Sequence, residues 1–177
     1  MTIWIGVDPG ASGAVAFIND RHQHARAMVF DLPRHATEPR LDGFALARLM
    51  REHAPADESA RVFLEKIHAI AKHSNGGNSM QSMGAMMKSV GIILGAIDCT
   101  RFPLQEVTPQ TWKRFYSLDR DKAKSLALAR RLYPELQPDL KRAKDEGRAE
   151  ALLIAHWGLA VNTGSYCSTD IESEVPF

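Results

Sequence analysis

Four acidic residues stand where their carboxylates could act together. Asp8 and Glu65 each end a short apolar run, so each is expected at the tip of a buried strand. Nearer the C-terminus, Glu146 and Glu150 are one helical turn apart and share a helix face. Two unit charges about 4 Å apart repel by roughly 4 kcal/mol at an effective dielectric of about 20, so converging carboxylates need a cation. Hard divalent ions that prefer oxygen ligands, Mg²⁺ or Mn²⁺, meet that need.

Taken singly, these acids have simpler explanations. Asp8 precedes a Pro-Gly pair and could begin a turn. Glu65 could be paired with a lysine, and Glu146, like Asp145 before it, could be an N-terminal acid favoured by the helix dipole. Glu150 lies inside an alanine-rich apolar turn, where a ligand role explains it better. Coincidence is much less plausible for the four together than for any one of them.

The elements that must position these acids follow from hydrophobic patterning and turn residues. Three apolar runs separated by turn signals predict an antiparallel three-strand meander, and a strand reached through a helix is expected to run parallel to the first strand. The predicted strands are 3–8, 14–18, 27–30, 61–65 and 104–107, and the predicted helices are 41–54, 79–98, 121–133 and one that begins at Asp145 or Glu146. This order predicts an α/β fold, a mixed five-stranded sheet flanked by helices, similar to the RNase H-like fold.

The predicted helix 79–98 is rich in methionine and glycine. Its apolar stripe is typical of a core helix, and part of it could instead form a two-fold dimer seam. Gly84, Gly91 and Gly95 lower its intrinsic helix propensity, so we expect tight packing against another element to compensate.

Length and composition favour one globular domain, residues 1–162, followed by a flexible acidic tail, 163–177. Cys99 and Cys167 are too few for a disulfide scaffold and are expected to be unreactive, which fits a reducing cytoplasm. Charged residues interrupt the longest apolar stretches, so no membrane span is expected.

The net charge of +1 hides a basic segment. Residues 101–148 hold twelve Lys or Arg against seven Asp or Glu. A basic segment beside acidic residues suggests a polyanionic substrate held next to a cation site, although a solvated helix face explains the composition equally well.

Four motifs, in order along the chain, carry a family resemblance. They are Ile5-Gly6-Val7-Asp8-Pro9-Gly10 with Ser12-Gly13, Val62-Phe63-Leu64-Glu65, Val107-Thr108-Pro109 with Trp112-Lys113, and the run from Gly147 to Ala155. Over residues 3 to 160 the chain resembles the RuvC family of Holliday junction resolvases, particularly its phage-type members. Each motif alone is weak, and the ordered set is specific.

The resemblance implies a homodimeric, metal-dependent endonuclease that cuts four-way DNA junctions symmetrically, with two Mg²⁺ ions per site for which Mn²⁺ can substitute. It assigns Asp8, Glu65, Glu146 and Glu150 as the catalytic metal ligands. The family usually has aspartates in the final helix, where this chain has two glutamates, so Asp145 could replace Glu146 as a ligand. A bacterial cytoplasm, with a possible phage origin of the gene, is the expected setting.

The basic residues near these motifs are candidate DNA contacts. The main candidates are Lys72, His73, Lys113, Arg114, Lys122, Lys124 and Arg148, with Arg130, Arg131, Lys141, Arg142 and Lys144 as further phosphate contacts. Plain solubilising charge accounts for about half of such positions. Trp112 and Trp157 are expected in the core.

Three other functions remain open on the sequence. The segment from Asp8 to Gly13 also resembles the phosphate loop of actin-like ATPases and sugar kinases, but those proteins need a second domain that 177 residues cannot supply. The chain could also be a non-catalytic junction-binding module. The third alternative is an RNA-directed or general flap nuclease on the same scaffold.

Overall fold

The computed structural model describes residues 2–10, 12–20, 26–67, 80–119 and 121–164. It contains one mixed sheet in the order β3-β2-β1-β4-β5, in which β1, β2 and β3 are antiparallel neighbours and β4 and β5 run parallel to β1. The strands are β1 (Thr2–Asp8), β2 (Ala14–Asn19), β3 (Arg26–Asp31), β4 (Ser59–Glu65) and β5 (Leu104–Val107). The predicted α/β class, the three antiparallel strands and the two parallel strands are confirmed.

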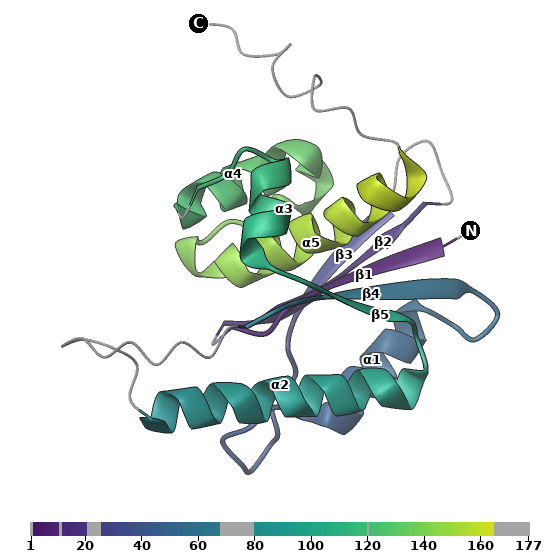
Figure 1. Cartoon of the computed structure of the whole chain (residues 1–177), viewed down its shortest axis with the longest axis vertical. Helices are drawn as coiled ribbons and strands as arrows, with labels where there is room; N and C mark the ends of the chain where they lie inside the picture. The colour runs from purple at the N-terminus through teal and green to yellow at the C-terminus, as the bar shows by residue number, and fades with distance from the viewer. Residues whose placement is uncertain (1, 11, 21–25, 68–79, 120, 165–177) are drawn as a thin grey trace, which may run out of the picture.

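Helices cover both faces of the sheet (Figure 1). On one face lie α1 (Gly43–His53) and α2 (Met80–Thr100). On the other lie α3 (Pro109–Phe115), α4 (Lys122–Leu132) and α5 (Glu146–Thr163), with the short 3-10 helices η1 (Pro134–Leu136) and η2 (Ala143–Asp145). Each face has its own apolar core.

The alternation of side chains along the strands decides which core each residue joins. In β1, Ile3, Ile5 and Val7 pack toward α1 and α2, whereas Trp4 packs toward α5. Because the strand period is two, Asp8 shares the face of Trp4 and is directed toward α5. The same rule places Glu65 on the α5 face with Phe63, which packs in that core.

Helix α5 comes unusually close to β1 and to the turn that follows it. A Cβ at Gly6 would lie 2.1 Å from the carbonyl oxygen of Ala151, and one at Gly147 would lie 2.0 Å from that of Ser12. Any side chain at either position would push the helix off the sheet. These two glycines therefore bring the first turns of α5 beside the tip of β1.

Helix α3 was not predicted. Thr108 caps its N-terminus, with the side-chain oxygen accepting a hydrogen bond from the Thr111 amide at 3.3 Å, and Pro109 occupies the first helical position. Seven residues are too few to show helical hydrophobic periodicity, so only the cap and the proline signalled this helix.

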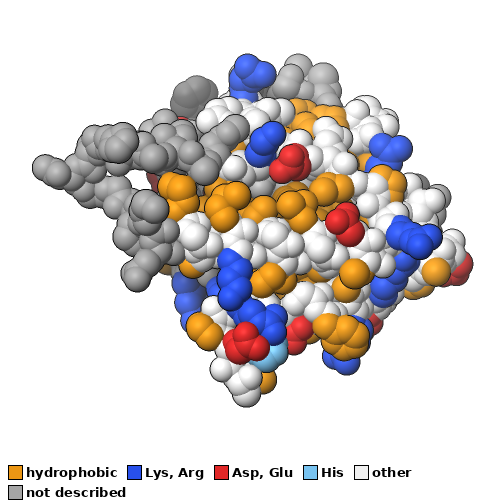
Figure 2. All heavy atoms as spheres, turned by 60° about the horizontal axis from the view of Figure 1, so that its bottom comes forward, with side chains coloured by type: hydrophobic (Ala, Val, Ile, Leu, Met, Phe, Trp, Pro, Cys, Tyr) orange, Lys and Arg blue, Asp and Glu red, His pale blue; other side chains and the backbone are white. Residues whose placement is uncertain are grey.

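The expectation of tight packing around the glycines of α2 is wrong. A Cβ at Gly84, Gly91 or Gly95 would meet no atom within 4 Å. Met87 is 46% exposed, and Figure 2 shows hydrophobic side chains gathered across this face of the molecule. Ile93 and Ile97 pack into the core, so α2 is anchored to the sheet along one stripe and exposes the opposite one.

One segment of α2, Ser82–Thr100, is long and apolar enough to cross a membrane, by length and composition alone. The expectation that no stretch reaches that length is therefore wrong on length and composition. A core helix of a soluble protein passes the same test, so the finding is weak support for a membrane span.

The last described helix ends at a left-handed glycine. Helix α5 ends at Thr163 and is followed by Gly164 in the left-handed conformation, with φ of 66°. The tail 165–177 and Cys167 lie outside the described residues, whereas Cys99 is free and exposed.

Candidate metal centre

Three of the predicted acids converge. Asp8, Glu65 and Glu150 each offer a carboxylate oxygen within 4.8 Å of the other two. They come from the ends of β1 and β4 and from the second turn of α5. Asp8 and Glu150 are both 7% exposed, and Glu65 is partly buried.

The sheet and one turn hold this geometry. Val7 is paired with Leu64 across the parallel strands, so the next residue of each strand, Asp8 and Glu65, leaves the same edge of the sheet. One oxygen of Asp8 accepts a hydrogen bond from the Gly10 amide at 3.0 Å. Asp8 therefore begins a turn, as one sequence reading held, and also presents its carboxylate to the cluster.

Burial and neighbouring charge raise the pKa of Asp8 and of Glu65. Burial raises the pKa of Asp8 to about 6; the Glu150 charge adds to this, and the Gly10 amide, Lys122 and Lys113 oppose it. Burial raises the pKa of Glu65 to about 7, with the charges of Asp8 and Glu150 adding to it. The raised pKa values mean that the surroundings of Asp8 and Glu65 disfavour their ionised forms, which is the condition that a divalent cation relieves.

Two lysines lie against the cluster. Lys113 Nζ is 2.7 Å from Glu150 Oε1, and Lys122 Nζ is 3.1 Å from Glu146 Oε2. The pKa of Lys122 is raised, first by its hydrogen bond to Glu146 and also by the charges of Glu150 and Asp8. Glu146 therefore lies at the edge of the site, held by Lys122, and outside the group of three carboxylates.

Asp145 has a structural partner. Its carboxylate accepts hydrogen bonds from the Arg142 side chain, at 2.7 Å from Nη2, and from the Arg142 amide at 2.8 Å. The Arg142 hydrogen bond lowers the pKa of Asp145. The structure thus places Asp145 in the cap of η2 and not among the converging carboxylates.

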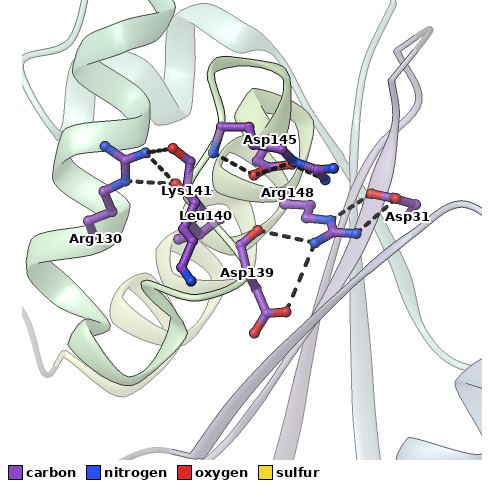
Figure 3. A network of polar contacts seen from close by, with 8 residues as sticks. Asp31, Arg130, Asp139, Leu140, Lys141, Asp145 and Arg148 are labelled. Atoms are coloured by element: carbon purple, nitrogen blue, oxygen red, sulfur yellow. Dashed lines mark hydrogen bonds and ion pairs between the residues drawn. The ribbon is translucent and has the colours of Figure 1, made fainter.

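Several basic residues predicted to contact DNA form hydrogen bonds within the protein instead. Arg148 donates to both oxygens of Asp31, at 2.7 and 2.8 Å, and to the carbonyl of Asp139 (Figure 3). Arg130 donates in the same region to the carbonyls of Leu140 and Lys141.

The remaining candidates differ in their surroundings. Lys124 pairs with Asp119, and Arg114 is exposed beside a cavity of about 570 Å³ that Lys113 also lines. Lys72 and His73 lie outside the described residues.

The role of Lys113 as the partner of Glu150 was not predicted from the sequence, because it depends on α3 starting at the edge of the sheet where the acids emerge.

A sheet in the order 3-2-1-4-5 with helices on both faces (Figure 1) defines the RNase H-like fold class, and three carboxylates that could hold a metal ion converge at one edge of this sheet. Among solved structures the chain is similar to Thermus thermophilus RuvC, with a TM-score of 0.58, 15% identity, and coverage of 92% of this chain and 97% of that one. It is also similar to T. thermophilus RuvC in complex with a Holliday junction substrate, with a TM-score of 0.59, 14% identity, and coverage of 93% and 98%. The chain therefore has the RuvC-type RNase H-like fold.

The chain is also similar in sequence to one curated protein. The chain is 44% identical over 73 residues to the chloroplastic Holliday junction resolvase MOC1 of Chlamydomonas reinhardtii, a match that spans 40% of this chain and 8% of that protein. No protein-family model matches the chain.

Proposed function

We propose that this chain is a metal-dependent endonuclease that resolves four-way DNA junctions by hydrolysing phosphodiester bonds. The observation that carries the proposal is the convergence of Asp8, Glu65 and Glu150 at one edge of a RuvC-type sheet. The name of the C. reinhardtii relative and the junction bound in one RuvC structure support the choice of substrate. Other branched DNA is a further expected substrate.

The donor set suits Mg²⁺, with Mn²⁺ as a substitute. It consists of oxygens, which hard divalent ions prefer, and the raised pKa values of Asp8 and Glu65 indicate that a cation would be bound favourably. Asp8, Glu65 and Glu150 would hold two ions, with Glu146 joining them if Lys122 releases it. The ions would supply an activated water and neutralise charge on the leaving oxygen.

The chain's own residues prepare the site for a phosphodiester. Burial of Asp8 and Glu150 fixes their carboxylates and limits competing water. Lys113 and Lys122, already beside the acids, would steady the phosphate oxygens, and exposed Arg114 would extend the contact. Since each neutralised phosphate releases counterions, junction affinity should fall steeply with salt concentration.

Symmetric cutting needs two active sites, which a homodimer provides. The exposed apolar stripe of α2, with open space at Gly84, Gly91 and Gly95, is the surface we propose for the contact. Met87→Glu should then shift the protein from dimer to monomer in sedimentation velocity. The control is Val161→Glu, because Val161 is as exposed as Met87, at 46%, and lies on α5 on the opposite face of the sheet. We place the activity in a reducing cytoplasm.

The deciding experiment incubates the protein with synthetic four-way, three-way and linear duplex DNA, with Mg²⁺, with Mn²⁺ and with EDTA. Cleavage of the four-way junction that needs the metal and is absent in Glu65→Gln is the expected result. Glu106→Gln is the matched control, because Glu106 is an exposed strand residue paired with Lys66 at 3.8 Å. Full cleavage by Glu65→Gln would end the proposal, and tight junction binding without any cleavage would favour the non-catalytic module.

A further inference from the structure

Trp112 has a buried polar atom without a partner. The side chain is 0% exposed, and its indole Nε1 makes no hydrogen bond within the part of the chain that the structure describes. Leaving a buried donor unpaired costs about 1 to 3 kcal/mol, and buried tryptophans usually find a partner for this group. Phenylalanine would fill a purely apolar site without that cost.

Trp112 lies on α3, the helix that begins beside the strand end carrying Glu65. Burial raises the pKa of Glu65, with Asp8 and Glu150 adding to it, whereas Lys113 and the N–H of Trp112 act in the opposite direction. Glu65 pairs with Val107 across β4 and β5, and α3 begins two residues after Val107, so Trp112 lies on the short helix that starts beside Glu65, and its indole N–H makes no ordinary hydrogen bond to the described residues there.

The neighbouring residue in α3 faces the second acid of the cluster. Lys113 Nζ is 2.7 Å from Glu150 Oε1 and 5.0 Å from the centre of the Trp112 ring. Two consecutive residues of one short helix therefore supply donors toward two different carboxylates. The ring of Trp112 also supports the lysine through a cation–π contact.

We propose that Trp112 is a positioning residue of the metal centre, whose indole N–H donates a hydrogen bond to Glu65 when that carboxylate binds a divalent cation. The inference rests on the proposed function, since it requires the metal site. A carboxylate has enough lone pairs to bind an ion and accept an N–H at once. Such outer hydrogen bonds fix the orientation of a ligand, and their loss typically weakens metal affinity by 10- to 100-fold.

A metal titration of the protein followed by indole ¹⁵N–¹H NMR tests this directly. The chain has three tryptophans, so three indole signals are expected, and Trp4→Phe and Trp157→Phe identify those of Trp4 and Trp157. Mg²⁺ should move the Trp112 signal downfield, as a hydrogen bond forms, and leave the Trp4 signal in place. Trp4 Nε1 already donates to Asp20 Oδ2 at 3.2 Å.

Calorimetric titration with Mn²⁺ gives the second readout. Trp112→Phe should bind Mn²⁺ about tenfold more weakly than the wild type. Trp4→Phe is the matched control, because it removes an indole N–H from another buried tryptophan and should leave the affinity unchanged. The thermal midpoint of metal-free Trp112→Phe should stay close to that of the wild type, since an unpaired donor is lost.

The two readouts separate the possible failures. An unmoved Trp112 signal in a wild type that binds Mg²⁺, or equal Mn²⁺ affinity in Trp112→Phe, overturns the positioning role and leaves the proposed function standing. A wild type that binds neither ion overturns the metal site and, with it, both proposals. The NMR signal is assigned from the other two tryptophans, so it is informative even if Trp112→Phe fails to fold.

Discussion

The ammonium group of Lys113 on α3 lies 2.7 Å from Glu150 Oε1 on α5, although 37 residues separate them in the chain. Both side chains are largely buried. The lysine thus supplies positive charge at the point where Asp8, Glu65 and Glu150 converge. An ion that enters the cluster competes with this lysine for Glu150.

Lys113→Met should destabilise the metal-free protein by about 1 to 3 kcal/mol, because Glu150 is left as a buried charge without its partner. Saturating Mg²⁺ should stabilise this variant more than the wild type, since the ion then faces no competitor. Urea unfolding with EDTA and with Mg²⁺ measures both effects. Lys66→Met is the control: its contact with Glu106, at 3.8 Å between exposed groups, should contribute less than about 1 kcal/mol.

The cluster should also make stability depend on pH. Asp8 and Glu65 have pKa values raised to about 6 and about 7, against ordinary values of 3.8 and 4.5. A carboxyl with a raised pKa binds its proton more tightly in the folded state, so its contribution to stability is lost as the pH rises from about 4 to about 7. The metal-free protein should lose this contribution across that range.

A comparison of thermal midpoints with and without Mg²⁺ separates the titration of Asp8 and Glu65 from that of other groups. Burial lowers the pKa of His156 to about 4, which acts in the opposite sense between pH 4 and 6.5. Mg²⁺ binds the ionised carboxylates, so the rise in thermal midpoint that it causes should be larger at pH 8 than at pH 5. An equal rise at both values would contradict the raised pKa values.

The sheet could be predicted from the sequence because the signals for its strands and turns lie in short stretches of neighbouring residues. Apolar runs, turn residues and the helix before the fourth strand were enough to predict the antiparallel meander and the parallel direction of that strand. The sequence also predicted that Asp8 and Glu65 would end neighbouring parallel strands, and in the structure the strand period places both on the face that carries α5. The convergence of these two acids with Glu150 could also be predicted from the sequence.

The rest of the site depends on distances that no local pattern encodes. The pairing of Lys113 with Glu150, and of Lys122 with Glu146, follows from how α3, α4 and α5 pack on one another. Two glycines show why the sequence alone is not enough: Gly6 lies against the Ala151 carbonyl, whereas Gly91 faces open space. The residue type is the same at both positions, so only the packing of the folded protein distinguishes them.

Arg148 should act on stability and not on DNA binding. Its bidentate pair with Asp31 joins α5 to β3, and Asp31 is 66% exposed, so Arg148→Met should cost about 1 kcal/mol. A double-mutant cycle with Asp31→Asn measures the coupling between the two residues. Because the guanidinium is already occupied, the salt dependence of junction binding should not change.

Lys122→Met, which removes a cation beside the acids, should lower the salt slope of junction binding by about one.

Gly147→Ala tests whether the close approach of α5 to the first turn builds the site. The added Cβ would lie 2.0 Å from the backbone oxygen of Ser12 and 3.1 Å from Asp8 Oδ2, so the helix start must move away from Asp8. We expect a loss of at least about 2 kcal/mol in unfolding free energy, together with weaker Mn²⁺ binding.

The matched control is Gly84→Ala in α2, where a Cβ meets no atom within 4 Å. That substitution should leave Mn²⁺ binding unchanged and stabilise the helix by up to about 1 kcal/mol, since alanine is the better helix former. Normal Mn²⁺ affinity in a folded Gly147→Ala protein would show that the position of Glu150 does not depend on this contact.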